Sequence, residues 1–395
     1  MSDISPAPDS SRAFSSDTYS DIDVDAIPRL IGAHMPTSGG LKTSLINGKA
    51  IGCTAVQLFT ASPRQWRHTP PGEEDIAAFL AARAETGIGF LVSHDSYLIN
   101  LAAPSPDVLE RSTGAFRAEL DRAEVLGISW VVTHMGAHLD KGEEEAMNRL
   151  VESLKAVLED TDRAGYKVGI ALETTAGQGT GLGWRFEQLG YILNGVGEHP
   201  RLGVCMDTCH VFAAGYDLRS EVSYKHTFDL FDSQIGLSKL KVLHCNDSKK
   251  PLGSRVDRHE HIGEGEIGLE TFARLMTDPA LLSVPAILET PDSETMHPVN
   301  LRRLQLMALG KIPEITVDVL LFGHYSDIFG EESIKVTLPV GSRVKNLAHL
   351  LSEKDQRLSG ISTNCRFAMN DEYVDLDTHL KEGSIVAATP PVSGG

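Results

Sequence analysis

The residues from Arg29 to about Gly310 alternate short apolar stretches with longer amphipathic ones. The first kind is typical of strands in a parallel sheet, and the second is typical of helices that cover such a sheet. Eight strand-then-helix units predict a TIM (β/α)8 barrel, with functional groups at the carboxyl ends of the strands. The predicted strands are Leu30–His34, Ala55–Thr60, Gly89–His94, Trp130–His134, Val168–Thr174, Leu202–Asp207, Lys241–Asn246 and Pro285–Thr290. The predicted helices include Asp75–Thr86, Pro106–Leu126, Glu143–Ala164 and Leu269–Met276.

Seven of these strands end in an imidazole or a carboxylate. The residues are His34, His94, His134, Glu173, Asp207, His244 and Glu289. One polar strand end is ordinary, and a lone D-x-x-H such as Asp207 to His210 is more often a helix cap beside a satisfied histidine. Seven in register, however, would converge at one mouth of the barrel. They suit zinc, manganese or a related divalent ion, and they are more than one ion needs.

The loop after the seventh predicted strand adds Asp257 and His259 in the stretch GSRVDRHEHIGEG. Alone, a D-x-H pair on a glycine-bounded loop is more often solvated surface. Beside the strand-end residues it predicts a further metal site. Several neighbouring divalent ions are what hydrolysis of a phosphodiester requires, because one activates water while another stabilises the leaving oxygen.

Six stretches of this region resemble the endonuclease IV family of apurinic/apyrimidinic endonucleases. They are HDSYLINL (94–101), ETTAGQG (173–179), DTCHVFAAGYD (207–217), HCNDSK (244–249), GSRVDRHEHIGEG (253–265) and LET (288–290). The resemblance covers nearly all of residues 29–305. It implies a phosphodiester hydrolase of base excision repair that incises double-stranded DNA 5′ to an abasic site. The products would be a 3′-hydroxyl and a 5′-deoxyribose phosphate.

The resemblance also implies three Zn2+ ions. The first would be bound by His94, His134 and Glu173, the second by Glu173 as a bridge with Asp207, His244 and Glu289, and the third by His210, Asp257 and His259. Glu173 and Glu289 would act in catalysis with a metal-activated water. Arg64 and Gln65 in FTASPRQWR, and Tyr97 in HDSYLIN, match family positions that contact damaged DNA, although such residues are also common in ordinary loop packing.

The net charge gives little information about the partner. A formal charge of −18 argues against a nucleic-acid partner at face value. Residues 1–27, however, hold six aspartates against one arginine, and residues 314–395 hold twelve acidic against seven basic side chains. Each segment therefore carries about −5, which leaves about −8 for the barrel region, part of which would be metal-binding carboxylate.

Composition also predicts the environment of the chain. Five cysteines without a C-x-x-C pair predict reduced thiols. Residues 1–27, rich in Ser, Asp and Pro, are predicted to be disordered and lack the features of a signal or transit peptide. The sequence contains no run of 18 apolar residues, so no membrane span is predicted. Without a long basic cluster, a cytoplasmic location is expected, with a nuclear one left open.

The pattern changes after Lys311. ITVDVLLFG and SIKVTLPVG alternate in period two around a polar turn, which predicts a hairpin. Val344–Ser352 is predicted as a helix, and CRFAMN, EYVDL and SIVAAT as short strands. This order predicts a small α+β domain with a β-grasp, ubiquitin-like fold over residues 314–395, following a barrel domain over residues 28–310.

The run NDEYVDLDTHLKEGSIVAATPPVSGG, which ends in Gly394 and Gly395, resembles the small sulfur-carrier subunit of molybdopterin synthase. Two residues without side chains can enter a narrow enzyme tunnel. The resemblance implies that an activating enzyme adenylates the Gly395 carboxylate, which then becomes a thiocarboxylate. The large synthase subunit would receive the sulfur for biosynthesis of the molybdenum cofactor.

Two alternatives remain beside this interpretation. The barrel fold is shared with sugar isomerases and epimerases, some of which use two metal ions; the third ligand set and the loop of Arg64 to Arg67 argue against them. Alternatively, the protein would act chiefly as a sulfur carrier with the barrel as a passenger. An intact set of nine ligands argues against an inactive barrel.

Overall fold

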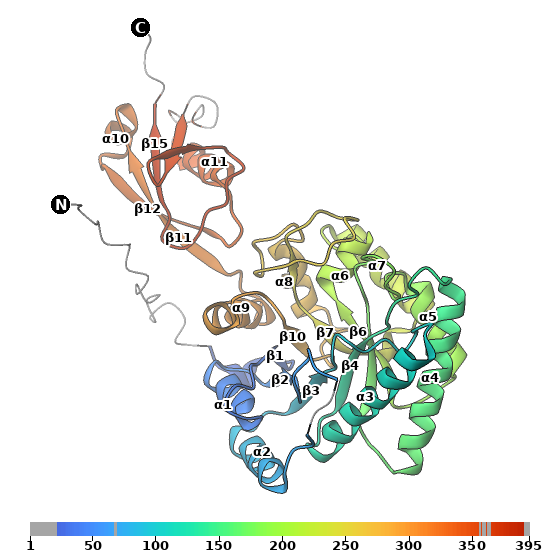
Figure 1. The fold of residues 1–395 in the computed structure, drawn as a ribbon. Helices are drawn as coiled ribbons and strands as arrows, with labels where there is room; N and C mark the ends of the chain where they lie inside the picture. The colour runs from blue at the N-terminus through green and yellow to red at the C-terminus, as the bar shows by residue number, and fades with distance from the viewer. Residues whose placement is uncertain (1–21, 67–68, 355–356, 358–360, 362–364, 391–395) are drawn as a thin grey trace, which may run out of the picture.

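The computed structural model describes residues 22–66, 69–354, 357, 361 and 365–390. Eight parallel strands close into a barrel, because β1 pairs with both β2 and β10 (Figure 1). The predicted TIM barrel is thus confirmed. The barrel strands are β1 (Ile31–His34), β2 (Ala55–Leu58), β3 (Phe90–His94), β4 (Trp130–His134), β5 (Gly169–Glu173), β6 (Leu202–Asp207), β7 (Leu240–His244) and β10 (Ala286–Leu288).

Helices follow the strands and surround the barrel (Figure 1). In α4, for example, Leu150, Leu154 and Leu158 are buried at a spacing of four residues, and three glutamates in the first turn favour its positive end. The helices of this domain are α1 (Lys42–Ala50), α2 (Glu73–Thr86), α3 (Pro106–Val125), α4 (Glu143–Arg163), α5 (Phe186–Val196), α6 (Thr208–Ala214), α7 (Glu221–Gln234), α8 (Leu269–Thr277) and α9 (Ser293–Ala308), with the 3-10 helices η2 (Val24–Ala26) and η3 (Leu237–Lys239).

The predicted boundaries differ from the observed ones by a few residues. Strand β10 ends at Leu288, so Glu289 follows the strand, and β2 ends at Leu58. The helix η2 lies within the segment expected to be disordered, of which residues 1–21 lie outside the described residues. Two short strands that the sequence did not predict, β8 (Asp247–Ser248) and β9 (His259–Glu260), form an antiparallel pair after β7.

The barrel interior is filled by small and branched side chains that point inward from alternate strand positions. This layer consists of Ala55, Val92, Val132, Ala171, Cys205, Val242 and Ile287. Glycine is required at position 32, since a Cβ there would lie 1.6 Å from the carbonyl oxygen of Ala55 on β2. The five cysteines are unpaired, and four of them are buried.

Residues 314–390 form a second domain, here the tail domain, as far as it is described. Its five-stranded sheet has the order β12-β11-β15-β13-β14, and α11 (Val344–Lys354) buries Leu347 and Leu351, which confirms the β-grasp prediction. The strands are β11 (Glu314–Leu321), β12 (Ser333–Pro339), β13 (Arg366–Met369), β14 (Glu372–Val374) and β15 (Ile385–Thr389). The connection expected as a polar turn instead contains the helix α10 (His324–Phe329), because Tyr325 is buried and anchors it.

The tail domain packs against the loop that follows β9. A Cβ on Gly341 would lie 2.0 Å from the carbonyl oxygen of Gly263, and Val340 is buried beside Gly263. The close approach of these two backbones therefore depends on glycine. Among the described residues, no helix has the length and apolar character needed to cross a membrane.

Candidate metal centre

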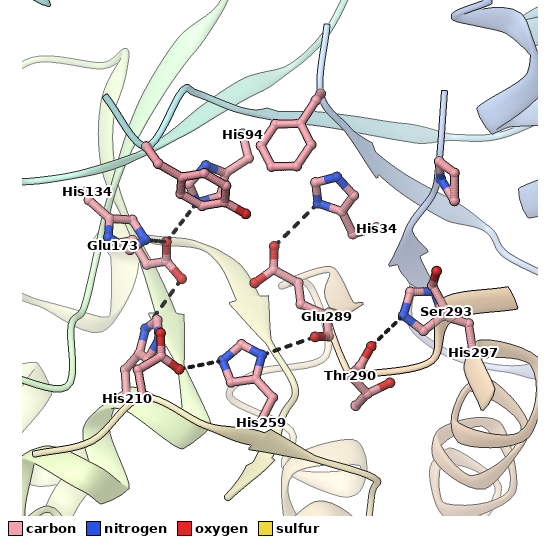
Figure 2. A pocket seen from close by; sticks show the side chains of 14 residues that line it. His34, His94, His134, Glu173, His210, His259, Glu289, Thr290, Ser293 and His297 are labelled. Atoms are coloured by element: carbon pink, nitrogen blue, oxygen red, sulfur yellow. Dashed lines mark hydrogen bonds and ion pairs between the residues drawn. The ribbon is translucent and has the colours of Figure 1, made fainter. Parts of the chain in front are cut away.

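Glu173, at the end of β5, lies at the centre of the barrel mouth, and its carboxylate lies close to three imidazoles, with a fourth, that of His210, at 3.6 Å. Its Oε2 lies 3.0 Å from Nε2 of His94 and 3.0 Å from Nε2 of His134, while its Oε1 lies 2.9 Å from Nδ1 of His244. Figure 2 shows His94 and His134 pointing toward this carboxylate. The barrel therefore brings together residues that lie up to 150 positions apart in the chain.

Two further carboxylates complete a second group around His244. Its Nδ1 lies 3.1 Å from Oε2 of Glu289 and 3.9 Å from Oδ2 of Asp207. Glu173, Asp207, His244 and Glu289 each offer one donor atom, and these atoms lie within 4.8 Å of one another. Glu289 differs from the others in being partly exposed, because it follows β10 at the wall of the mouth.

A third group lies on the side of the loop between β8 and β9. Nε2 of His210 lies 3.2 Å from Oδ2 of Asp257, and Nε2 of His259 lies 3.3 Å from Oδ1 of the same carboxylate. The side chain of Asp257 is 42% exposed, so this group is more open to solvent than the other two. The three groups have the composition of the three ligand sets that the resemblance implies.

The second nitrogen of several imidazoles is held by a carbonyl oxygen. Nδ1 of His94 lies 3.0 Å from the carbonyl oxygen of Asp95, and Nδ1 of His210 lies 2.8 Å from that of Thr174. Nδ1 of His259 lies 3.0 Å from the carbonyl oxygen of Glu289. A nitrogen beside a carbonyl carries the proton, so the other nitrogen presents a lone pair to the cluster. Nε2 of His259 is buried and has no hydrogen-bond partner. This donor set fits a divalent metal.

The pKa values of these groups reflect burial and mutual charge. Burial opposes the charge on His94, but the hydrogen bond and charge of Glu173 raise its pKa to about 9. Burial also opposes ionisation of Glu173, yet His244 and His134 hold its pKa well below the usual range. Against the same effect of burial, His210 lowers the pKa of Asp257 to about 2. Glu173 and Asp257 are thus ionised at neutral pH, and metal ions would displace protons from the imidazoles.

Two cysteines lie beside the ligands. Cys205 belongs to a group with Glu173 and His244, and Cys209 to a group with Asp207 and His259. Burial raises the pKa of Cys205 to about 12 and that of Cys209 further. A thiolate is the form that binds metal, so burial disfavours both as ligands.

Three residues beneath the ligands were missed by the sequence interpretation. Gln57 on β2 contacts His244 and Glu289, and Nδ2 of Asn246 donates to Oδ2 of Asp207 at 2.7 Å. Asp247 is fully buried and accepts hydrogen bonds from the loop after β9. The available signal for Gln57 is an amide in the apolar strand AVQL, and that for the other two is the stretch HCNDSK.

A cavity of about 400 Å³ opens at the mouth above these groups. Besides the ligands, His34, Phe59, Tyr97 and His297 line it (Figure 2). Tyr97 is 65% exposed, and its ring centroid lies 5.7 Å from that of Phe59. Arg64 and Gln65 are exposed on the loop after β2, so the predicted DNA-contacting residues lie at the surface near the mouth.

Residues 47–308 match the family described as Xylose isomerase-like TIM barrel. A probable endonuclease 4 of Chloroflexus aggregans is 47% identical over 286 residues, which are 72% of this chain and 99% of that protein. The chain belongs to the endonuclease IV family. A crystal structure of endonuclease IV from Thermus thermophilus is 35% identical, with a TM-score of 0.63, and the match covers 71% of this chain and 99% of that chain. At the level of the family, the barrel domain is an endonuclease.

Structures outside the endonuclease IV family share the barrel alone. A D-tagatose 3-epimerase-like protein matches with 18% identity and a TM-score of 0.56, over 71% of this chain and 97% of that chain. At this identity the similarity shows a common fold. Residues 319–395 match the ThiS family, so the tail domain is of the sulfur-carrier type, as predicted. Gly394 and Gly395 lie outside the described residues.

Proposed function

We propose that the barrel domain is a zinc-dependent endonuclease that incises DNA 5′ to abasic sites, as in base excision repair. The third donor group, formed by His210, Asp257 and His259, is the observation that carries this proposal. Sugar isomerases and epimerases of this fold can use two ions, whereas three neighbouring ions suit hydrolysis of a phosphodiester. Membership in the endonuclease IV family supports the same conclusion.

Each group would hold one Zn2+ ion. When bound, such ions lower the pKa of an attacking water and stabilise the leaving oxygen. Glu173 presents one carboxylate oxygen to the first group and the other to His244, so it would fix the separation between the first two sites. Glu289 lines the cavity and would orient the water beside the phosphorus. The products would be a 3′-hydroxyl and a 5′-deoxyribose phosphate.

The cavity would take the abasic nucleotide after it leaves the duplex. Phe59 and Tyr97 supply an aromatic wall on the side of the exposed loop that carries Arg64. A deoxyribose without a base presents apolar ring carbons to such a wall. Extrusion costs least where stacking and pairing are already lost, so the damaged position would be selected by its low cost of unstacking.

The test is incision of a duplex with one synthetic abasic site by the full-length protein, with the metal content of the same sample determined. Cleavage on the 5′ side with about three zinc ions per chain supports the proposal. A zinc-loaded protein that leaves the duplex intact contradicts it. In that case, epimerisation of a ketose by the same sample would identify the alternative, a sugar-converting barrel.

We propose that the tail domain carries sulfur as a thiocarboxylate at Gly395 for molybdenum cofactor biosynthesis. The match to the ThiS family and the β-grasp fold support this assignment. Its partners would be an adenylating enzyme and the large subunit of molybdopterin synthase. Since the reaction requires a free terminal carboxylate, one residue added after Gly395 should prevent formation of the adduct. A mass spectrum that still shows the sulfur adduct would refute the assignment.

Both reactions fit a reducing compartment. The five cysteines are unpaired, and such thiols persist where the thiol pool is reduced. We therefore propose a cytoplasmic location, which fluorescence microscopy of a chain tagged at its N-terminus would test.

A further inference from the structure

We propose that Gln57 is a positioning residue of the metal centre, which fixes two ligands, His244 and Glu289, and orients His34 at the cavity wall. The inference rests on the proposed metal sites. Gln57 is fully buried on β2, in register with His34 on β1. Along β2, Ala55 contributes to the interior layer of the barrel, so Gln57, two residues later, points to the same side.

All the strong hydrogen-bonding groups of the Gln57 side chain are used. Nε2 donates to Oε1 of Glu289 at 2.5 Å and lies 3.0 Å from Nδ1 of His34. Oε1 lies 2.8 Å from Nε2 of His244. The chemistry of the partners fixes the orientation of the amide, because an ionised carboxylate can only accept and must therefore face the amide nitrogen. The amide oxygen then faces His244.

This orientation determines which nitrogen of His244 carries the proton. His244 donates from Nε2 to the amide oxygen, so its Nδ1 keeps a lone pair in the space between Glu173 and Glu289. Nδ1 of His34 lies 3.0 Å from the amide nitrogen and 3.4 Å from Oε1 of Glu289, so the same group of contacts fixes the His34 ring at the cavity wall. One amide thus aims a candidate ligand nitrogen, holds a candidate ligand carboxylate and contacts a residue that lines the substrate cavity.

The same substitution at two buried glutamines separates this role from a general contribution to packing. Gln57→Met removes both donors and the acceptor with little change of volume. Gln305→Met is the matched control, since Gln305 is also buried, on α9, and its Nε2 donates to the Gly52 oxygen at 2.9 Å, outside the mouth. Zinc affinity of each apoprotein is measured by competition with a chromophoric chelator, and incision of an abasic duplex gives kcat and KM.

In Gln57→Met we expect one ion to bind about 10- to 100-fold more weakly, and kcat to fall similarly while KM for the duplex changes little. Gln305→Met is expected to lower stability and to leave zinc affinity unchanged. Wild-type affinity for all ions in folded Gln57→Met overturns the proposal. An equal loss of affinity in Gln305→Met does so as well, because it assigns the effect to packing.

If circular dichroism shows that Gln57→Met does not fold, Gln57→Asn is titrated in the same way. Its amide is one methylene shorter and cannot reach Glu289 and His244 together, so wild-type zinc affinity there also overturns the proposal. The chelator titration needs no substrate. A wild-type protein that fails to incise DNA would therefore refute the proposed function, while the weaker zinc binding of Gln57→Met would still support the positioning role.

Discussion

Replacement of Asp247 by alanine tests how the loop that follows His259 and β9 is held in place. The Asp247 carboxylate is fully buried and accepts hydrogen bonds from three backbone N–H groups of the loop after β9. The distances are 3.0 Å to Gly263, 3.1 Å to Gly265 and 3.0 Å to Ile267. Ser248 N also donates to this carboxylate, at 2.8 Å, so Asp247→Ala would leave four N–H groups without this partner, of which those of Ser248, Gly263 and Ile267 belong to buried residues.

The size of the effect follows from two opposing contributions. Each unsatisfied buried N–H costs about 1–3 kcal/mol, which gives a loss of roughly 3–9 kcal/mol for three. Burial raises the pKa of Asp247 to about 6, although the backbone hydrogen bonds of Ser248, Ile267, Gly265 and Gly263 oppose the rise. This shift of about two units corresponds to about 3 kcal/mol spent on burying the charge, which alanine releases. The difference is a net loss of roughly 0–6 kcal/mol, with a central value of about 3 kcal/mol.

Urea unfolding measures the stability, and amide hydrogen exchange measures the loop directly. Exchange at Gly263, Gly265 and Ile267 should accelerate in Asp247→Ala, and zinc should bind more weakly to the group that contains His259. Asp229→Ala, which removes an exposed carboxylate paired with a lysine, is the control and should change neither. Unchanged exchange at the three amides would refute the reasoning, whatever the change in overall stability.

Three further perturbations test other parts of the structure. Glu173→Gln should reduce incision at least 100-fold in a gel assay, because one neutral oxygen replaces a carboxylate shared by two sites; a retained rate would exclude the bridging role. Burial lowers the pKa of His297 to about 4, so its neutral form stabilises the fold above about pH 6.5, and this contribution is lost as the pH falls toward 4. Wild-type protein should therefore lose about 2 kcal/mol more than His297→Gln between pH 7 and pH 5 in urea unfolding, and parallel losses would contradict this. Gly341→Ala should disrupt the contact with Gly263 and make the chain near Ile312 more sensitive to proteolysis. Gly330→Ala, also at positive φ but in open space, should not change the cleavage rate. Equal resistance of both variants would show that the contact between Gly341 and Gly263 is dispensable.

The clustering of the candidate metal ligands was predictable from the sequence because these residues occupy a position that the fold defines. In a parallel barrel, the residue that ends each strand reaches the same mouth, so strands ending in His94, His134 and Glu173 predict a cluster without any knowledge of distances. Glu289 follows its strand by one residue, yet the predicted location holds, because the mouth extends into the first loop residues.

The residues beneath the ligands were not predictable in the same way. Gln57 lies within a strand, where a single amide is equally consistent with an edge position or a local exception to the apolar pattern. Its proposed role depends on the closure of the barrel, which brings His34 of β1, His244 of β7 and Glu289, just after β10, within reach of one side chain. Closure is a property of the whole set of strands, and the local pattern of one strand does not contain it.

The loop after β9 links the two domains more closely than their separate families suggest. It begins directly after His259 and Glu260 of β9, and the backbone N–H groups of its Gly263 and Ile267 both donate to the Asp247 carboxylate. The carbonyl oxygen of Gly263 is also the atom that a Cβ on Gly341 of the tail domain would strike. The tail domain therefore contacts the barrel four residues from His259 of the third group, whereas the three residues of the first group end the barrel strands β3, β4 and β5. Any effect of the tail domain on the nuclease should accordingly reach the third group before the other two, since a loop yields more readily than a barrel strand.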